Sequence, residues 1–174
     1  MNHRGFWSLI DGTRQASDGV CERQAEVLTE LLRQQEPEDI IAFHRMFLEF
    51  VYAAYTWDLW GAAYIIHGGC SDDCFEYFRR WLIGHGEAAY MAAVQNPESL
   101  VPLLDVEDAG TGGHECEELG YAADDAYEQR TGQAMPPLPM LDTELPAEPR
   151  GEKWNEEELA QRFPQLASAC GWDT

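Results

Sequence analysis

The stretch from Trp57 to Ile83 constrains the fold of this chain more than any other part of the sequence. It reads WDLWGAAYIIHGGCSDDCFEYFRRWLI, so two segments rich in apolar and aromatic residues flank one compact polar turn. Gly68 and Gly69 are typical of the end of a helix, and Ser71 followed by two aspartates is typical of the start of the next. The pattern predicts two packed helices that meet at this turn, with the polar groups at a shared corner.

Apolar residues at helical spacing predict further helices on either side of this stretch. The expected face of the first helix consists of Val20, Val27, Leu28, Leu31 and Leu32. The expected face of the second, which Pro37 begins, consists of Ile40, Phe43, Met46, Phe47, Phe50, Val51 and Ala54. Residues 57 to 66 are apolar on most sides and predict a central helix. No run alternates like a strand, so the sequence predicts an all-α fold, a compact helical bundle.

Beyond the turn, the pattern of helices continues and then weakens. Phe75, Phe78, Trp81 and Leu82 predict the buried face of a helix that Gly84 ends. Asn96-Pro97-Glu98 is typical of another helix start. Residues 114 to 130 form a weaker candidate, because the apolar stripe is thin.

Proline and charge divide the chain unevenly. Five of the nine prolines fall between Ala134 and Arg150, which favours an extended path there. We therefore expect a helical domain over residues 1–130, a Pro-rich strap over 131–153, and a short C-terminal helix and tail over 154–174. Asn155, followed by three glutamates, is the expected N-cap of that helix, which should dock back on the domain.

The balance of charge excludes several classes of function. Eleven Lys and Arg against 32 Asp and Glu give a formal charge of -21, which repels nucleic-acid phosphates and anionic membranes. No run of 18 apolar residues is present, and we expect a soluble cytoplasmic protein. The five cysteines are an odd number and mostly far apart, so we expect reduced thiols.

Three motifs resemble DUF4240, a bacterial family of domains of unknown function. They are Phe6-Trp7-x-Leu9-Ile10, then Trp57-Asp58-Leu59-Trp60-x-Ala62-Ala63-Tyr64, then Gly68-Gly69-Cys70-Ser71-Asp72-Asp73-x-Phe75-x-Tyr77-Phe78-Arg79-x-Trp81-Leu82-Ile83. The resemblance spans roughly the first hundred residues. It implies a site near the polar turn but no reaction, and the acidic, Pro-rich remainder departs from the pattern.

The polar turn offers candidate catalytic residues in His67, Cys70, Asp72 and Asp73. A thiol at a helix N-terminus loses its proton more readily, and His67 could act as its base. The two aspartates oppose this, because negative charge raises the pKa of a neighbouring thiol. A structural interpretation explains most of the motif: two glycines end one helix, Ser71 caps the next, and the acids offset its dipole.

A zinc site is the second interpretation of the same turn. Its weak candidate ligands are His67, Cys70 and Cys74, joined by His85, His114 or Cys116. The usual paired CxxC motifs are absent, and two inert buried thiols are the alternative. A calcium loop at Asp105, Glu107 and Gly110 is rejected, because Ala109 and Cys116 occupy positions that need oxygen ligands. We expect no cofactor.

Two charged residues, Asp58 and Arg79, lie inside the aromatic segments. We expect Asp58 and Arg79 to pair between two helices, since an unpaired buried charge is unfavourable. The alternative is a ligand-binding pocket for a carboxylate or phosphate, lined by Trp57, Asp58, Trp60, Tyr77, Arg79 and Arg80.

Two functions of different class remain. The first is a non-catalytic accessory or binding module that engages a basic protein or peptide, through an aromatic groove beside the turn or through the acidic C-terminal part. The second is a small enzyme, zinc-dependent in one version, that uses His67, Cys70, Asp72 and Asp73.

Overall fold

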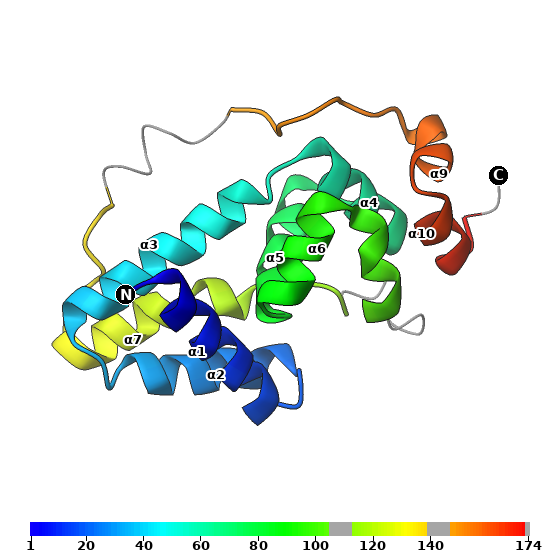
Figure 1. Ribbon diagram of the computed structural model, residues 1–174. Helices are drawn as coiled ribbons and strands as arrows, with labels where there is room; N and C mark the ends of the chain where they lie inside the picture. Colours follow the sequence, from blue (N-terminus) through cyan, green and yellow to red (C-terminus); the bar gives the residue numbers. More distant parts are fainter. Residues whose placement is uncertain (105–112, 139–146, 173–174) are drawn as a thin grey trace.

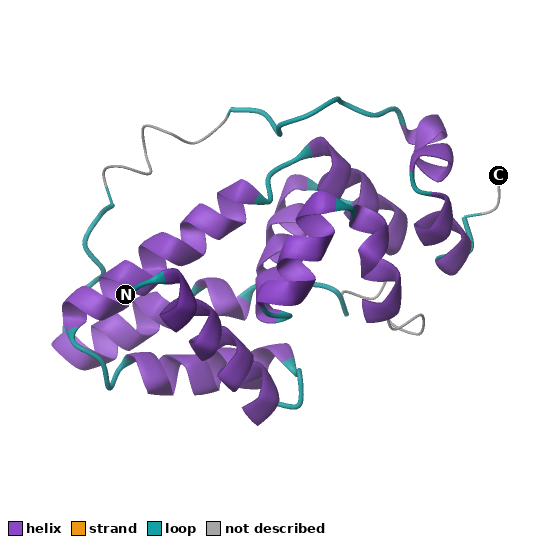
Figure 2. Cartoon of the chain, viewed as in Figure 1, coloured by secondary structure: helices purple, strands orange, loops and turns teal. Residues whose placement is uncertain are grey.

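The computed structural model describes residues 1–104, 113–138 and 147–172, and in these ranges the fold is all-α, as predicted (Figure 1). Figure 2 shows helices joined by loops, and the one β-type contact in these ranges is an isolated parallel bridge between Thr56 and Arg150. The larger helices are α1 (His3–Ala16), α2 (Cys21–Leu32), α3 (Pro37–Ala53), α4 (Trp57–His67), α5 (Asp72–Gly84), α6 (Glu87–Gln95) and α7 (Ala122–Thr131). Shorter elements are the 3₁₀ helices η1 (Pro97–Leu103), η2 (Glu118–Gly120) and η3 (Glu156–Glu158), and helices α9 (Leu159–Arg162) and α10 (Pro164–Ala169).

The helices form two groups that share one core. Helices α1, α2, α3 and α7 pack together at one end of the molecule, and α4, α5 and α6 pack at the other (Figure 1). Helix α5 contacts α1, α2 and α3 as well as α4 and α6, so it joins the two groups. No helix in the described ranges is long and apolar enough to cross a membrane.

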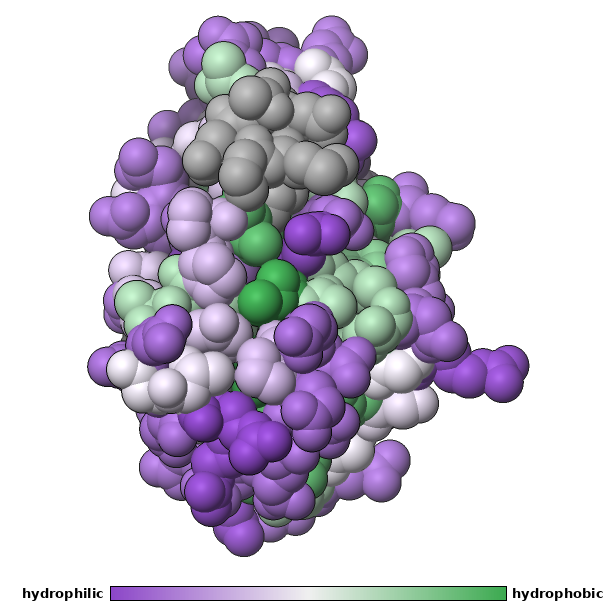
Figure 3. All heavy atoms as spheres, turned by 90° about the vertical axis from the view of Figure 1, so that its left-hand side faces the viewer, coloured by the Kyte–Doolittle hydropathy of each residue, from purple (hydrophilic) through white to green (hydrophobic). Residues whose placement is uncertain are grey.

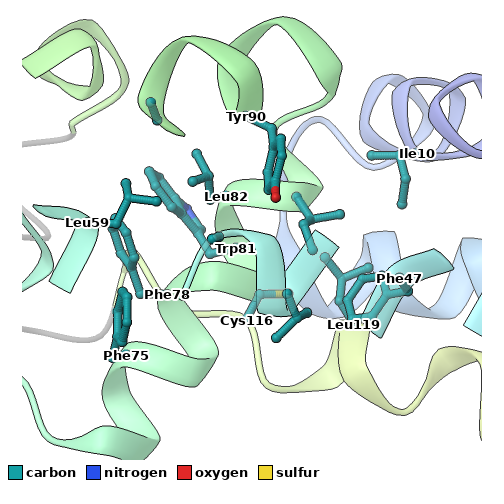
Figure 4. Close-up of a cluster of buried hydrophobic side chains, with 14 of the residues drawn as sticks. Ile10, Phe47, Leu59, Phe75, Phe78, Trp81, Leu82, Tyr90, Cys116 and Leu119 are labelled. Carbon is teal, nitrogen blue, oxygen red and sulfur yellow. The ribbon is translucent and has the colours of Figure 1, made fainter. Parts of the chain in front are cut away.

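The core follows the predicted stripes on α3 and α5. Ile40, Phe43, Phe47 and Val51 are buried on α3, and Phe75, Phe78, Trp81 and Leu82 are buried on α5. Figure 4 shows the α5 row beside Leu59 of α4, with Leu119 and Cys116 approaching from the segment before α7. A 3.6-residue apolar period is therefore a sufficient signal for these two helices.

The predicted buried face of α2 is wrong in part. Leu28 and Leu32 are buried, but Val20 is 52 % exposed and Leu31 is 36 % exposed. Gln24 is buried in their place, because its side-chain nitrogen donates a 3.0 Å hydrogen bond to the Gly84 carbonyl at the end of α5. Because the hydrogen bond makes burial of Gln24 favourable, the buried face of α2 includes Gln24 and excludes the more apolar Val20 and Leu31.

The polar turn between α4 and α5 has the predicted construction. Gly68 caps α4 with φ 69°, a left-handed conformation that favours glycine. The Ser71 hydroxyl accepts a 3.2 Å hydrogen bond from the Cys74 N–H and so caps α5, with Asp72 and Asp73 in the first turn. The boundary between the two helices therefore lies at residues 68–71.

Two helices begin differently from the prediction. The candidate over residues 114 to 130 starts only with η2 at Glu118, and α7 follows from Ala122. The single C-terminal helix is instead η3, α9 and α10, interrupted at Phe163 because the residue before Pro164 disfavours helical backbone. Asn155 precedes η3 without a side-chain capping hydrogen bond. Residues 105–112 of the rejected calcium loop and strap residues 139–146 lie outside the described residues.

Candidate functional site

The corner predicted from the polar turn does gather potential ligand atoms. A ring nitrogen of His67, Sγ of Cys74 and a carboxylate oxygen of Glu115 all lie within 4.8 Å of one another. His67 ends α4, Cys74 lies in the first turn of α5, and Glu115 comes from the segment before η2. Glu115 was not predicted, because only the tertiary fold brings it to residues about 40 positions earlier in the chain.

Burial makes His67 an uncharged base at this corner. Its side chain is 5 % exposed, and Nδ1 lies 3.6 Å from Glu115 Oε1, beyond ordinary hydrogen-bond length. Burial and the neighbouring His114 lower the pKa of His67 to about 4. Burial also raises the pKa of Glu115. At neutral pH the imidazole therefore has a nitrogen lone pair available for a ligand.

The expectation of reduced thiols is wrong for four of the five cysteines. Cys21 is bonded to Cys116 across 95 residues, and Cys70 is bonded to Cys74; Cys170 is free. Sequence spacing alone did not reveal the first pair, because the packing of α2 against the segment before η2 creates it. The second pair forms because Cys70 and Cys74 lie on either side of the Ser71 cap.

The predicted catalytic set does not assemble as one unit. Cys70 is in a disulfide and has no thiol to act as a nucleophile. Asp72 and Asp73 are exposed in the first turn of α5, and neither belongs to the His67, Cys74 and Glu115 cluster. His85, a candidate fourth zinc ligand, lies against Trp81 instead, with Nδ1 3.1 Å from the Trp81 carbonyl. Cys116 is bonded to Cys21, as above.

The predicted pair of Asp58 and Arg79 is wrong. Asp58 pairs with Arg162 of α9, and Arg79 donates to the carbonyls of Val51 at 2.8 Å and Phe75 at 3.2 Å. The Arg79 guanidinium also lies over the Tyr55 ring, and burial lowers the pKa of Arg79 to about 10. Arg79 is 6 % exposed, so it stabilises the interior of the bundle and does not face a ligand pocket.

The aromatic surface around Trp57 and Trp60 is covered in part by the chain itself. Trp57 stacks on Trp60 with ring centroids 5.5 Å apart, and Trp60 stacks on Phe75. Trp154 then packs edge-on against Trp57 and donates a 2.7 Å hydrogen bond to its carbonyl. The expected aromatic groove is thus occupied beside α4 by residues of the C-terminal segment.

Arg80 and Tyr77 lie near a different surface. Arg80 pairs with Glu76 and donates a 2.9 Å hydrogen bond to the Glu117 carbonyl, and its guanidinium lies over the rings of Tyr77 and Tyr121. Hydrogen bonds from Tyr121 and Tyr77 lower the pKa of Glu117. Arg80 therefore supports the segment that carries Tyr121, which is 48 % exposed.

That segment forms one wall of an acidic groove of about 530 Å³. The groove runs between α2 and the η2–α7 segment, and it is lined by Glu22, Ala25, Glu26, Thr29, Glu30, Glu118, Tyr121, Asp125 and Gln129. Of its five carboxylates, Glu30 alone has an ion-pair partner in the described ranges, Arg33 at 2.6 Å. Sequence reasoning missed this groove, although glutamates at positions 22, 26 and 30 share one helix face.

The groove differs in charge from the other hollow of the surface. Figure 3 views the end of the molecule where α3 begins and α7 ends, and it shows hydrophilic residues over the lower part and edges of that face and a hydrophobic patch in its middle. A second hollow of about 470 Å³ is lined by Asp11, Arg14, Gln15, Asp18 and Gly19 and so mixes both signs of charge. The groove beside α2 and α7 is the more strongly acidic of the two.

Comparison with known proteins places the chain in a family. Residues 1–129 match the family described as "Protein of unknown function (DUF4240)", so the chain belongs to it, as the motifs indicated. No curated protein and no solved structure matches the chain. Both the corner at His67 and the acidic groove lie within the matched residues, whereas the C-terminal segment on α4 lies beyond them.

Proposed function

We propose that this protein is a non-catalytic binding module that holds a lysine- or arginine-rich segment of a partner protein in the acidic groove between α2 and α7. The observation that carries the proposal is the set of five carboxylates around one concavity, four of them without a cationic partner in the described part of the chain. A basic side chain is the natural complement to such a surface.

Tyr121 adds a second element of recognition. Its ring is half-exposed at the groove, and its hydroxyl donates a 2.7 Å hydrogen bond to Glu117, which fixes its position. The face of a fixed aromatic ring attracts an ammonium or guanidinium group, and the guanidinium of Arg80 already lies 5.5 Å from the centroid of this ring. A cation of the partner would therefore use the part of the ring that Arg80 leaves exposed. A basic peptide fits this combination better than a neutral or acidic one.

The proposal includes no direct binding to nucleic acid or membranes, and it includes a cytoplasmic location. The net charge of -21 opposes direct binding to nucleic acid or to an anionic membrane. A cytoplasmic location remains part of the proposal, although disulfides are rare in cytosolic proteins and are there usually transient, with a catalytic or redox-sensing role. A catalytic role is not favoured, because Asp72 and Asp73 stand apart from His67.

Fluorescence anisotropy with a labelled lysine- and arginine-rich peptide tests the proposal. Glu26→Gln combined with Asp125→Asn removes two groove carboxylates, and we expect affinity to fall by roughly 10-fold at low salt. The matched control, Glu49→Gln with Glu157→Gln, removes the same charge from exposed positions elsewhere, and it should change affinity by less than about 2-fold.

Two results would count against the groove. Equal weakening in both double variants would mean that net charge alone attracts the peptide. Affinity that does not fall as salt rises would mean that the contact is not electrostatic.

A further inference from the structure

The corner at His67 is separate from the acidic groove, and the proposed function leaves it unexplained. We propose that His67, Cys70, Cys74 and Glu115 form a structural zinc site when the Cys70–Cys74 disulfide is reduced. The site would join the end of α4, the start of α5 and the segment before η2.

The distances suit a tetrahedral ion. Zinc bonds nitrogen and oxygen at about 2.0–2.2 Å and sulfur at about 2.3 Å, so neighbouring ligand atoms lie roughly 3–4 Å apart. His67 Nδ1 and Glu115 Oε1 are already 3.6 Å apart, and the His67, Cys74 and Glu115 ligand atoms span no more than 4.8 Å. Cys70 Sγ is bonded to Cys74 Sγ but lies outside this 4.8 Å group, so it would move toward the other three atoms after reduction to become the fourth ligand.

The state of His67 is an independent sign of a ligand. Its side chain is 5 % exposed, yet Nε2 is buried and has no hydrogen-bond partner in the described ranges. A buried polar atom without a partner is unfavourable, and coordination of the metal by Nε2 would give this atom a partner, whereas coordination by Nδ1 would leave it without one.

Assembly of the site requires reduction of the Cys70–Cys74 disulfide, for which one dithiol is sufficient. A dithiol gives two electrons and two protons to the Cys70–Cys74 disulfide, which yields two thiols and leaves the reductant as its own disulfide. Zn²⁺ then replaces the two thiol protons, which are released to solvent. The N-terminus of α5 favours the resulting thiolates, whereas Asp72 and Asp73 in its first turn oppose them. Four protein ligands would leave no open position, which is typical of a structural site.

Cobalt(II) is the probe that tests the site, because its tetrahedral thiolate complexes absorb strongly. We expect the full chain, reduced with a phosphine under anaerobic conditions, to bind one Co²⁺ with a thiolate charge-transfer band that Zn²⁺ then abolishes. The oxidised protein should show no band. Absence of the band in the reduced protein would overturn the proposal.

Variants assign the ligands. Cys74→Ser should weaken Co²⁺ binding by more than about 100-fold, since even loss of an outer-sphere partner weakens metal sites about 10- to 100-fold. His67→Gln and Glu115→Gln should each weaken it while far-UV circular dichroism is unchanged. Cys70→Ser gives a second thiolate test if Cys74→Ser fails to fold.

Cys21→Ser is the matched control, because Cys21, Cys116 and Glu118 form another cluster of potential ligands in the described ranges. Co²⁺ affinity should not change in this variant. Loss of the band in Cys21→Ser, or full affinity in Glu115→Gln, contradicts the ligand set proposed here.

Discussion

Gly61 shows how one missing side chain allows the C-terminal segment to approach α4. A Cβ at this position would lie 2.8 Å from Leu159, 3.0 Å from Phe163 and 3.1 Å from Trp154. We expect Gly61→Ala to lower the free energy of unfolding by about 1–3 kcal/mol, because an overpacked contact displaces its neighbours. Urea unfolding measures the effect.

Gly12→Ala is the matched control for this substitution. Gly12 lies in the exposed middle of α1, and a Cβ there meets nothing within 4 Å. We expect it to raise stability by up to about 1 kcal/mol through helix propensity. The same sign of change in both variants would contradict the close packing at Gly61.

Individual partners were harder to predict than buried faces. Asp58 lies in an apolar helix, which correctly indicates that it has a partner, but that partner is Arg162, 104 residues further on. Glu115 at the His67 corner, and Cys116 opposite Cys21, depend likewise on where a distant segment packs. Local periodicity does not contain such information.

At the scale of elements, Ser71 and Asn155 are two residues of similar capping preference in different situations. Ser71 accepts a hydrogen bond from the Cys74 N–H, whereas Asn155 makes no side-chain capping bond. Ser71→Ala should therefore lower the free energy of unfolding by about 1 kcal/mol, and Asn155→Ala should change it by less than about 0.5 kcal/mol. Thermal unfolding of both variants distinguishes them, and a larger loss in Asn155→Ala would refute the assignment.

The elements themselves were predictable where the apolar period was strong. Helices α3 and α5 follow from their stripes, and the glycines and Ser71 locate the turn before α5. The apolar pattern predicts the wrong face for part of α2, because the polar Gln24 is buried there with a hydrogen bond to Gly84. It also predicts one C-terminal helix, whereas Pro164 begins a separate helix, α10. Helix α6 was not predicted, because its small apolar residues give no clear stripe.

At the scale of the whole molecule, the Cys21–Cys116 disulfide closes the larger of the two disulfide loops in the described residues, and its two cysteines are 95 positions apart in the sequence. Loss of a crosslink of this span lowers stability by about 4.7 kcal/mol in the chain-entropy account. We expect Cys21→Ala with Cys116→Ala, measured by urea unfolding without reductant, to show a loss of this order. Cys170→Ser should be neutral, and an unchanged double variant would contradict the crosslink.

The whole fold also separates the two candidate sites. The acidic groove is formed by α2 and the η2–α7 segment, and the His67 corner is formed by α4, α5 and the residues before η2. Failure of zinc binding would therefore leave the groove proposal intact, and failure of peptide binding would leave the zinc proposal intact.

A residue-resolved NMR titration of the full chain with a lysine- and arginine-rich peptide tests the central claim most directly. The account predicts amide shift changes at Glu22, Glu26, Tyr121 and Asp125 that saturate with peptide and diminish as salt is added. Shifts concentrated instead at Trp57, or spread evenly over exposed acids throughout the chain, would contradict it.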